Sequence, residues 1–127
     1  MGEVPTILLI DDEEALLRLM QIYLDRMGYN VYACGTSADA MRMLADQSHQ
    51  IHLAVADLSL LQSPSALVEM ADQFPDVRVL VCSGLPFEVG VLPERVRPRF
   101  GSLQKPFLPN MLSEAIDELL QREPKTS

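Results

Sequence analysis

The sequence predicts an α/β fold in which a parallel sheet is covered by helices on both faces. Short runs of β-branched and aliphatic residues alternate five times with longer stretches in which apolar residues recur at helical spacing. The run at residues 77–82 is apolar throughout, as expected of a central parallel strand that is buried on both sides. With 127 residues, the chain is long enough for one sizeable core and too short for two ordinary domains.

The first two strand–helix units begin near the N-terminus. Thr6–Ile10 forms the first strand, and the helix after it ends at Gly28. The apolar stripe of that helix consists of Leu16, Met20, Tyr23, Leu24 and Met27. Residues 31–34 form the second strand, and Thr36 or Ser37 can cap the helix that follows. Its buried stripe consists of Ala40, Met41 and Leu44.

The third unit starts with a strand at residues 52–56 that runs directly into Asp57. Its helix begins with Ser63 as N-cap and Pro64 at the first helical position. The residues expected to face the core are Leu67, Met70, Ala71 and Phe74.

The last two units are uneven. After the fourth strand, at residues 77–82, any fourth helix must be short or interrupted, because the following segment contains Pro86, Gly90, Pro93 and Pro98. Residues 99–103 form the fifth strand. The last helix is strongly amphipathic and precedes a polar tail at residues 123–127, with a stripe of Leu112, Ala115, Ile116, Leu119 and Leu120.

Composition and charge exclude several classes of function. The apolar runs are far shorter than a membrane span and no basic, apolar leader opens the sequence, so we expect a cytoplasmic protein without membrane contact. Ten basic and eighteen acidic residues give a net charge of -8, which repels nucleic acid. Cys34 and Cys82 both lie in predicted strands, so buried free thiols are expected in place of a disulfide.

Polar residues follow the ends of four predicted strands. Asp11 and Asp12 follow the first strand, Asp57 the third, Ser83 the fourth and Lys105 the fifth. Ligands of doubly wound sheets bind outside the carboxyl ends of the strands, so these side chains are expected to meet. Three carboxylates there repel each other unless a hard cation with oxygen ligands binds, for which Mg²⁺ is the abundant candidate. An aspartate beside such a cation can accept a phosphoryl group as a mixed anhydride.

Each of these residues also has an ordinary structural interpretation. An acidic pair after a strand can stabilise a helix N-terminus, Asp57 can be a turn residue, and Ser83 can be a cap. The ordered set of five favours the phosphoryl-transfer site. His49 and His52 flank a junction between a loop and a strand, so we interpret them as surface or partly buried neutral histidines, not as a metal pair.

The segments "LLIDDE", "VADLSL", "VCSG" and "LQKPF" resemble, in this order, the receiver domain of two-component response regulators, over nearly the whole chain. The resemblance implies a flavodoxin-like sheet of order 2-1-3-4-5, within a receiver domain of residues 1–122. It implies Asp57 as the phosphoacceptor and Asp12 and Asp57 as direct magnesium ligands. The Ser59 carbonyl would be a third ligand, and Asp11 a contact through water.

The same resemblance implies further roles for the site and for its partners. Ser83 matches the switch hydroxyl and Lys105 the phosphate-binding lysine, with a cis bond between Lys105 and Pro106. The implied function is that of a phosphoacceptor in a two-component phosphorelay, not an enzyme beyond self-catalysed phosphorylation and dephosphorylation. A histidine kinase or phosphotransfer protein would donate the phosphoryl group. A downstream protein would bind the face of the fourth helix, fifth strand and fifth helix.

Two segments depart from the family pattern. The loop after Asp57 reads Leu-Leu-Gln-Ser-Pro at residues 60–64, where a Met-Pro dipeptide and a nearby glycine are usual. Ser102 stands three residues before Lys105, where Tyr or Phe is usual, and Phe100 lies two residues earlier on the same face of the strand. Either Phe100 replaces the missing aromatic, or the coupling between hydroxyl and aromatic is absent.

Alternatives of function therefore remain open. One is a phosphate-independent interaction module with the same fold, and another is a magnesium-dependent phosphatase, for which one short domain offers little room for a substrate pocket. The chain is either a stand-alone regulator or a receiver cut from a larger protein such as a hybrid histidine kinase.

Overall fold

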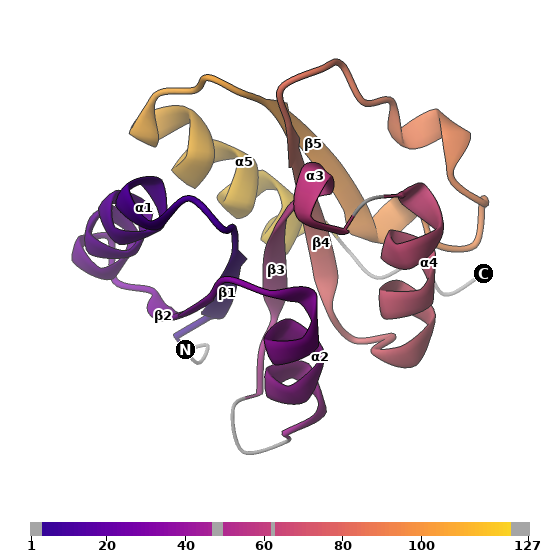
Figure 1. The fold of residues 1–127 in the computed structure, drawn as a ribbon, viewed down its shortest axis with the longest axis horizontal. Helices are drawn as coiled ribbons and strands as arrows, with labels where there is room; N and C mark the ends of the chain where they lie inside the picture. The colour runs from indigo at the N-terminus through magenta and orange to yellow at the C-terminus, as the bar shows by residue number, and fades with distance from the viewer. Residues whose placement is uncertain (1–3, 47–49, 62, 123–127) are drawn as a thin grey trace.

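The protein, described by a computed structural model over residues 4–46, 50–61 and 63–122, is built on one parallel sheet (Figure 1). Its strands lie in the order β2-β1-β3-β4-β5. They are β1 (Thr6–Ile10), β2 (Asn30–Cys34), β3 (Leu53–Asp57), β4 (Arg78–Ser83) and β5 (Phe100–Gln104). All four neighbouring pairs are parallel. The predicted fold class and strand order are confirmed.

Helices cover both faces of this sheet. α1 (Glu14–Arg26) and α5 (Pro109–Gln121) pack on one face, whereas α2 (Ser37–Ala45) and α4 (Pro64–Gln73) pack on the other. A single turn, α3 (Leu58–Leu61), lies at the carboxyl end of β3 (Figure 1). Within the described ranges, no helix is both long enough and apolar enough to span a membrane.

The helix starts follow the predicted capping chemistry. The Thr36 hydroxyl accepts a hydrogen bond from the Asp39 amide (3.1 Å) at the start of α2. At the start of α4, the Ser63 hydroxyl accepts one from the Ala66 amide, and Pro64 is the first helical residue, as predicted.

The end of α1 corrects one prediction. Gly28 follows the helix with φ +100, a left-handed conformation that glycine adopts without strain. Met20 and Leu24 are buried as expected, but Met27 is 54% exposed. The helix ends at Arg26, so Met27 lies beyond the last turn that packs on the sheet.

Three strands lie one residue further along the chain than predicted. They are β3, β4 and β5, which were expected at residues 52–56, 77–82 and 99–103. By contrast, β2 begins one residue earlier than expected, at Asn30. The displacement makes Asp57 and Ser83 the last residues of their strands, where Asp57 pairs with Cys82 and Ser83 with Gln104. The sheet therefore holds the backbone of both candidate site residues.

The connection from β4 to β5 contains two short 3₁₀ turns, Val89–Val91 and Arg97–Arg99, where a full fourth helix had been doubted. Buried Leu92 and Val96 anchor it in the core. Arginines tie it to α4: Arg95 donates two hydrogen bonds to Asp72 (2.7 and 3.2 Å). The Arg99 guanidinium donates to three carbonyls at the end of α4 and just beyond it, those of Ala71, Phe74 and Val77.

Candidate functional site

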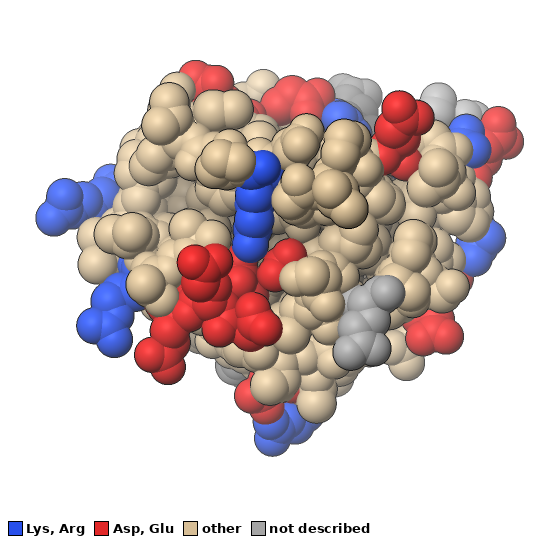
Figure 2. Space-filling view, turned by 45° about the horizontal axis from the view of Figure 1, so that its top comes forward, with Lys and Arg blue, Asp and Glu red and all other residues tan. Residues whose placement is uncertain are grey.

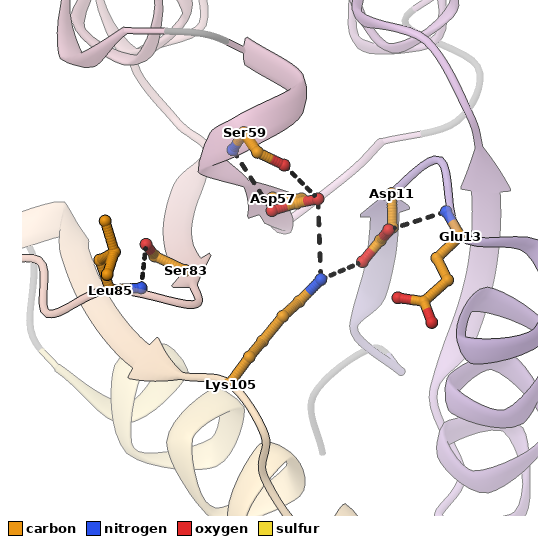
Figure 3. A network of polar contacts seen from close by, with 7 residues as sticks. All are labelled: Asp11, Glu13, Asp57, Ser59, Ser83, Leu85 and Lys105. Atoms are coloured by element: carbon orange, nitrogen blue, oxygen red, sulfur yellow. Dashed lines mark hydrogen bonds and ion pairs between the residues drawn. The ribbon is translucent and has the colours of Figure 1, made fainter.

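The candidate site lies at the carboxyl edge of the sheet, where three charged side chains from distant parts of the chain meet (Figure 3). Asp11 directly follows β1, Asp57 ends the adjacent β3, and Lys105 directly follows β5. The Lys105 amide donates to the Ser83 carbonyl (2.8 Å), which continues the β4–β5 ladder and fixes the lysine backbone. The Lys105–Pro106 bond is cis, as predicted.

The Lys105 ammonium pairs with both buried carboxylates. Its Nζ lies 2.9 Å from Asp11 Oδ2 and 3.6 Å from Asp57 Oδ2. Partial burial disfavours the charged ammonium, but the hydrogen bond to Asp11 and the charges of Asp11 and Asp57 outweigh it, so the pKa of Lys105 is raised. The lysine therefore stays charged throughout the physiological pH range.

Asp12 completes an acidic cluster with Asp11 and Asp57. One carboxylate oxygen of each lies within 4.8 Å of those of the other two, with Asp11 and Asp57 buried and Asp12 exposed. Figure 2 shows acidic side chains gathered around the end of a basic side chain on the surface at this edge. One ammonium cannot neutralise three carboxylates. Their oxygens are the donor set that a small hard cation such as Mg²⁺ takes, so the residues fit the predicted metal.

Ser59 contacts both oxygens of the Asp57 carboxylate. It lies in the first turn of α3, where its amide donates to Oδ1 (3.3 Å) and its hydroxyl to Oδ2 (3.0 Å). Neither contact was predicted from the sequence, where only the carbonyl of Ser59 was assigned a role. Aspartate is a strong N-cap residue, so a signal for the short helix after Asp57 was available in the sequence.

Ser83 lies apart from the charged network in this conformation. Its hydroxyl accepts a hydrogen bond from the Leu85 amide (3.1 Å), within its own loop (Figure 3). The predicted switch hydroxyl thus lies at the end of β4, as expected. Its hydrogen bond is made to the β4–β5 connection and not to the charged side chains.

Ser102 borders a small cavity of about 130 Å³. The other residues that line it are Ser83, Leu85, Pro86, Phe87, Leu103 and Gln104. Phe100 does not reach this cavity, because it is buried in the core cluster with Leu92 and Val96. In this structure Phe100 therefore does not take the place of the missing aromatic. The aromatic side chain next to Ser102 is that of Phe87.

His52 has a structural role at the start of β1, where its Nδ1 accepts a hydrogen bond from the Thr6 amide (2.9 Å). His49, like the tail at 123–127, lies outside the described residues.

No protein-family model matches the chain. A response regulator receiver protein from Sinorhizobium medicae WSM419, known from its crystal structure, is 30% identical to this chain in sequence. The similarity covers 95% of this chain and 98% of that chain, with a TM-score of 0.76. This chain belongs to the response regulator receiver domains.

Two further relatives extend the comparison of this receiver. A response regulator protein from Burkholderia pseudomallei, crystallised with a phosphorylated aspartic acid, a calcium ion and citrate, has a TM-score of 0.71. It is 23% identical, over 87% of this chain and 65% of that chain. Sensor kinase CckA of Brucella abortus (strain 2308) is 24% identical over 120 residues. The match covers 93% of this receiver and 13% of the length of CckA.

The two cysteines of the receiver are buried free thiols, as predicted. Burial raises the pKa of Cys34. For Cys82, burial outweighs the positive charge of Lys105, which lowers the pKa, and with the negative charges of Asp11 and Asp57 it raises the pKa to about 12. Both thiols are thus protonated and shielded at pH 8. We expect Ellman's reagent to leave the native protein unmodified at that pH and to titrate both cysteines in urea.

The raised thiol pKa values also set a pH dependence of stability. Above about pH 8.5 the unfolded chain loses thiol protons that the folded chain keeps, so the free energy of unfolding should fall as pH rises further.

The experiment with Ellman's reagent can contradict the prediction of protected thiols. Rapid modification of the native protein at pH 8 would show that the strands open locally and that these thiols are not protected.

Proposed function

We propose that this receiver accepts one phosphoryl group on Asp57 and transmits the signal by protein contact. The observation that carries the proposal is the arrangement around Asp57. A nearly fully buried carboxylate at the end of β3 lies beside a lysine ammonium and two further carboxylates. The Burkholderia protein with its phosphorylated aspartic acid has the same fold, which supports the proposal.

The chemistry follows from the positions of these side chains. A carboxylate oxygen of Asp57 attacks phosphorus, and the bond between phosphorus and the donor breaks, so that the donor leaves with the electron pair. Lys105 already lies 3.6 Å from Asp57 Oδ2, so its ammonium can pair with the phosphoryl oxygens without a change of the backbone. The strand ladder limits the motion of the nucleophile, which favours an in-line approach.

Magnesium belongs to the same proposal. Asp12 and Asp57 would hold the ion directly, with the Ser59 carbonyl as a third ligand and Asp11 as a contact through water. When bound, the ion supplies positive charge that neutralises the phosphoryl oxygens and the acidic cluster.

A histidine kinase or a phosphotransfer protein is the proposed donor, since the comparable segment of CckA belongs to a sensor kinase. The cytoplasm is the proposed location. The proposed output surface comprises the β4–β5 connection, β5 and α5. Exposed apolar side chains on or beside it are Leu85, Val91 and Leu108. A net charge of -8 makes a nucleic-acid partner unfavourable.

One observation favours the alternative of a phosphate-independent module. Ser102 is small and exposed, and the cavity beside it lacks the side chain that would couple Ser83 to β5. A receiver that accepts phosphate without moving this region would act as a simple interaction domain.

The first prediction of the proposed function concerns the acceptor. Incubation with acetyl phosphate and Mg²⁺ should add the mass of one phosphoryl group to the intact protein. Asp57→Asn should abolish the addition, whereas Asp25→Asn, on the exposed face of α1, should leave it unchanged. If the wild-type mass stays constant with several phosphodonors, the alternative of a phosphate-independent module is correct.

The second prediction concerns the metal. With an assumed dissociation constant of about 1 mM, about 10 mM Mg²⁺ should raise the free energy of unfolding by roughly 1.4 kcal/mol, because the ion binds the assembled carboxylates and not the unfolded chain. Thermal melting would show this as a rise of a few degrees. Asp12→Ala should lose the response and Asp25→Ala should keep it. An Asp12→Ala protein with the wild-type magnesium response would show that the metal lies elsewhere.

The third prediction concerns the signal. Beryllofluoride, a phosphate mimic, should draw the Ser83 hydroxyl from the Leu85 amide toward Asp57. Chemical-shift changes should therefore extend into the β4–β5 connection. Ser102→Tyr should enlarge these changes, because a tyrosine can fill the cavity beside Phe87 and add contacts that differ between the two states. Changes confined to the residues around Asp57 would rule out transmission through this connection.

A further inference from the structure

A small cavity lies between β5 and the loop that follows β4. Its volume is about 130 Å³, and a cavity of about 150 Å³ lined by apolar side chains is enough to hold benzene. The space arises on the β5 side because position 102 carries serine, a small residue that is exposed. The cavity therefore has room for one six-membered aromatic ring.

The residues that line this cavity determine how a ring would enter it. Phe87 and Leu103 are half-buried and supply apolar surface, and two aromatic rings attract each other in edge-to-face or offset geometry. Ser83 is 9% exposed, so it lies at the inner end. Ser102 and Gln104 are exposed and therefore mark the side that is open to solvent. A ring that enters there points its far edge toward Ser83 and its bond to the rest of the molecule outward.

Exposed apolar residues border the cavity on the loop side. Leu85 lines it and is 75% exposed, and Pro86 next to it is exposed as well. Apolar surface of this kind is typical of a site of protein–protein interaction. Leu85 also belongs to the proposed output surface, so the cavity is continuous with that surface. A side chain of a bound protein is therefore a better occupant than a free small molecule.

We propose that the cavity binds one phenylalanine side chain of the downstream protein, and binds it more tightly when Asp57 carries a phosphoryl group. The inference rests on the proposed function, in which the Ser83 hydroxyl moves toward Asp57. In this structure that hydroxyl accepts a hydrogen bond from the Leu85 amide at the cavity wall. Its departure would leave more room and a more apolar inner end for the far edge of the ring.

The choice of phenylalanine follows from the same movement. A tyrosine would place its hydroxyl at the inner end, where a buried hydroxyl needs a polar partner. Ser83 can be that partner only before it moves, so phosphorylation would weaken the binding of tyrosine. A ring without a hydroxyl needs no such partner and gains from the movement. Because coupling between two sites is reciprocal, the bound phenylalanine also strengthens the binding of a phosphate mimic by the same factor.

N-acetyl-phenylalanine amide serves as the probe, because it carries the side chain and the backbone of a phenylalanine residue without a charge. It is titrated into the isotope-labelled protein in Mg²⁺, with and without beryllofluoride, and the amide chemical shifts are recorded. We expect saturable changes at residues 85, 87 and 102–104, with a dissociation constant in the millimolar range that falls about fivefold in beryllofluoride. N-acetyl-alanine amide should cause no saturable change there.

Ser102→Tyr tests the location, because its own ring fills the cavity and should abolish binding of the phenylalanine probe. Ser65→Tyr makes the same change at an exposed serine of α4 outside the cavity and should bind the probe as the wild type does. Equal melting temperatures would show that both variants keep the fold.

The inference is overturned if the alanine probe causes the same changes, if Ser102→Tyr binds the phenylalanine probe as tightly as the wild type, or if no saturable change occurs. It is also overturned if beryllofluoride occupies Asp57, as seen by fluorine NMR, without tightening the binding of the probe. A protein that binds no beryllofluoride would overturn the proposed function, and the coupling with it. Saturable binding of the phenylalanine probe to that protein would still support the cavity as a site for a ring.

Discussion

Two buried carboxylates, those of Asp11 and Asp57, lie next to each other at the carboxyl edge of the sheet, and the Lys105 ammonium bridges them. Buried like charges are costly unless they are paired, so this bridge is what allows adjacent strands to end in acidic residues. Asp12 adds a third carboxylate at the solvent side. In the proposed function, the excess of negative charge would favour a divalent cation at this edge. The lysine that offsets the repulsion would then be available to the phosphoryl oxygens.

Much of the architecture could be predicted from the sequence. The alternation of apolar strands with amphipathic helices gave the fold class, because both patterns reflect which face of each element is buried. The caps at Thr36 and Ser63 were predictable since each is a local interaction between a side chain and the amide three residues on. Asp11, Asp57 and Lys105 were predictable as a group because parallel strands present their carboxyl ends at one edge.

Other features depend on contacts between distant residues and left little trace in the sequence. The strand ends were misplaced by one residue because local composition does not reveal where a ladder stops. Arg99 binds the carbonyls at the end of α4 from more than twenty residues away, and nothing in its neighbourhood predicts those partners. Phe100 was a candidate for the site from its alternation with Ser102. Only the packing shows that it belongs to the core and that Phe87 borders the cavity.

The contacts of the proposed acceptor and those of the proposed switch hydroxyl are separate in this receiver. Asp57 is held by the sheet and by Ser59, whereas the Ser83 hydroxyl accepts a hydrogen bond from the Leu85 amide of its own loop. A crystal structure of the protein with Mg²⁺ and beryllofluoride tests the central claim most directly. Our account predicts density joined to the Asp57 carboxylate, an ion among Asp11, Asp12 and Asp57, and Lys105 in contact with a fluorine atom. A bare Asp57 at saturating beryllofluoride, with Lys105 still bound to Asp11, would contradict it.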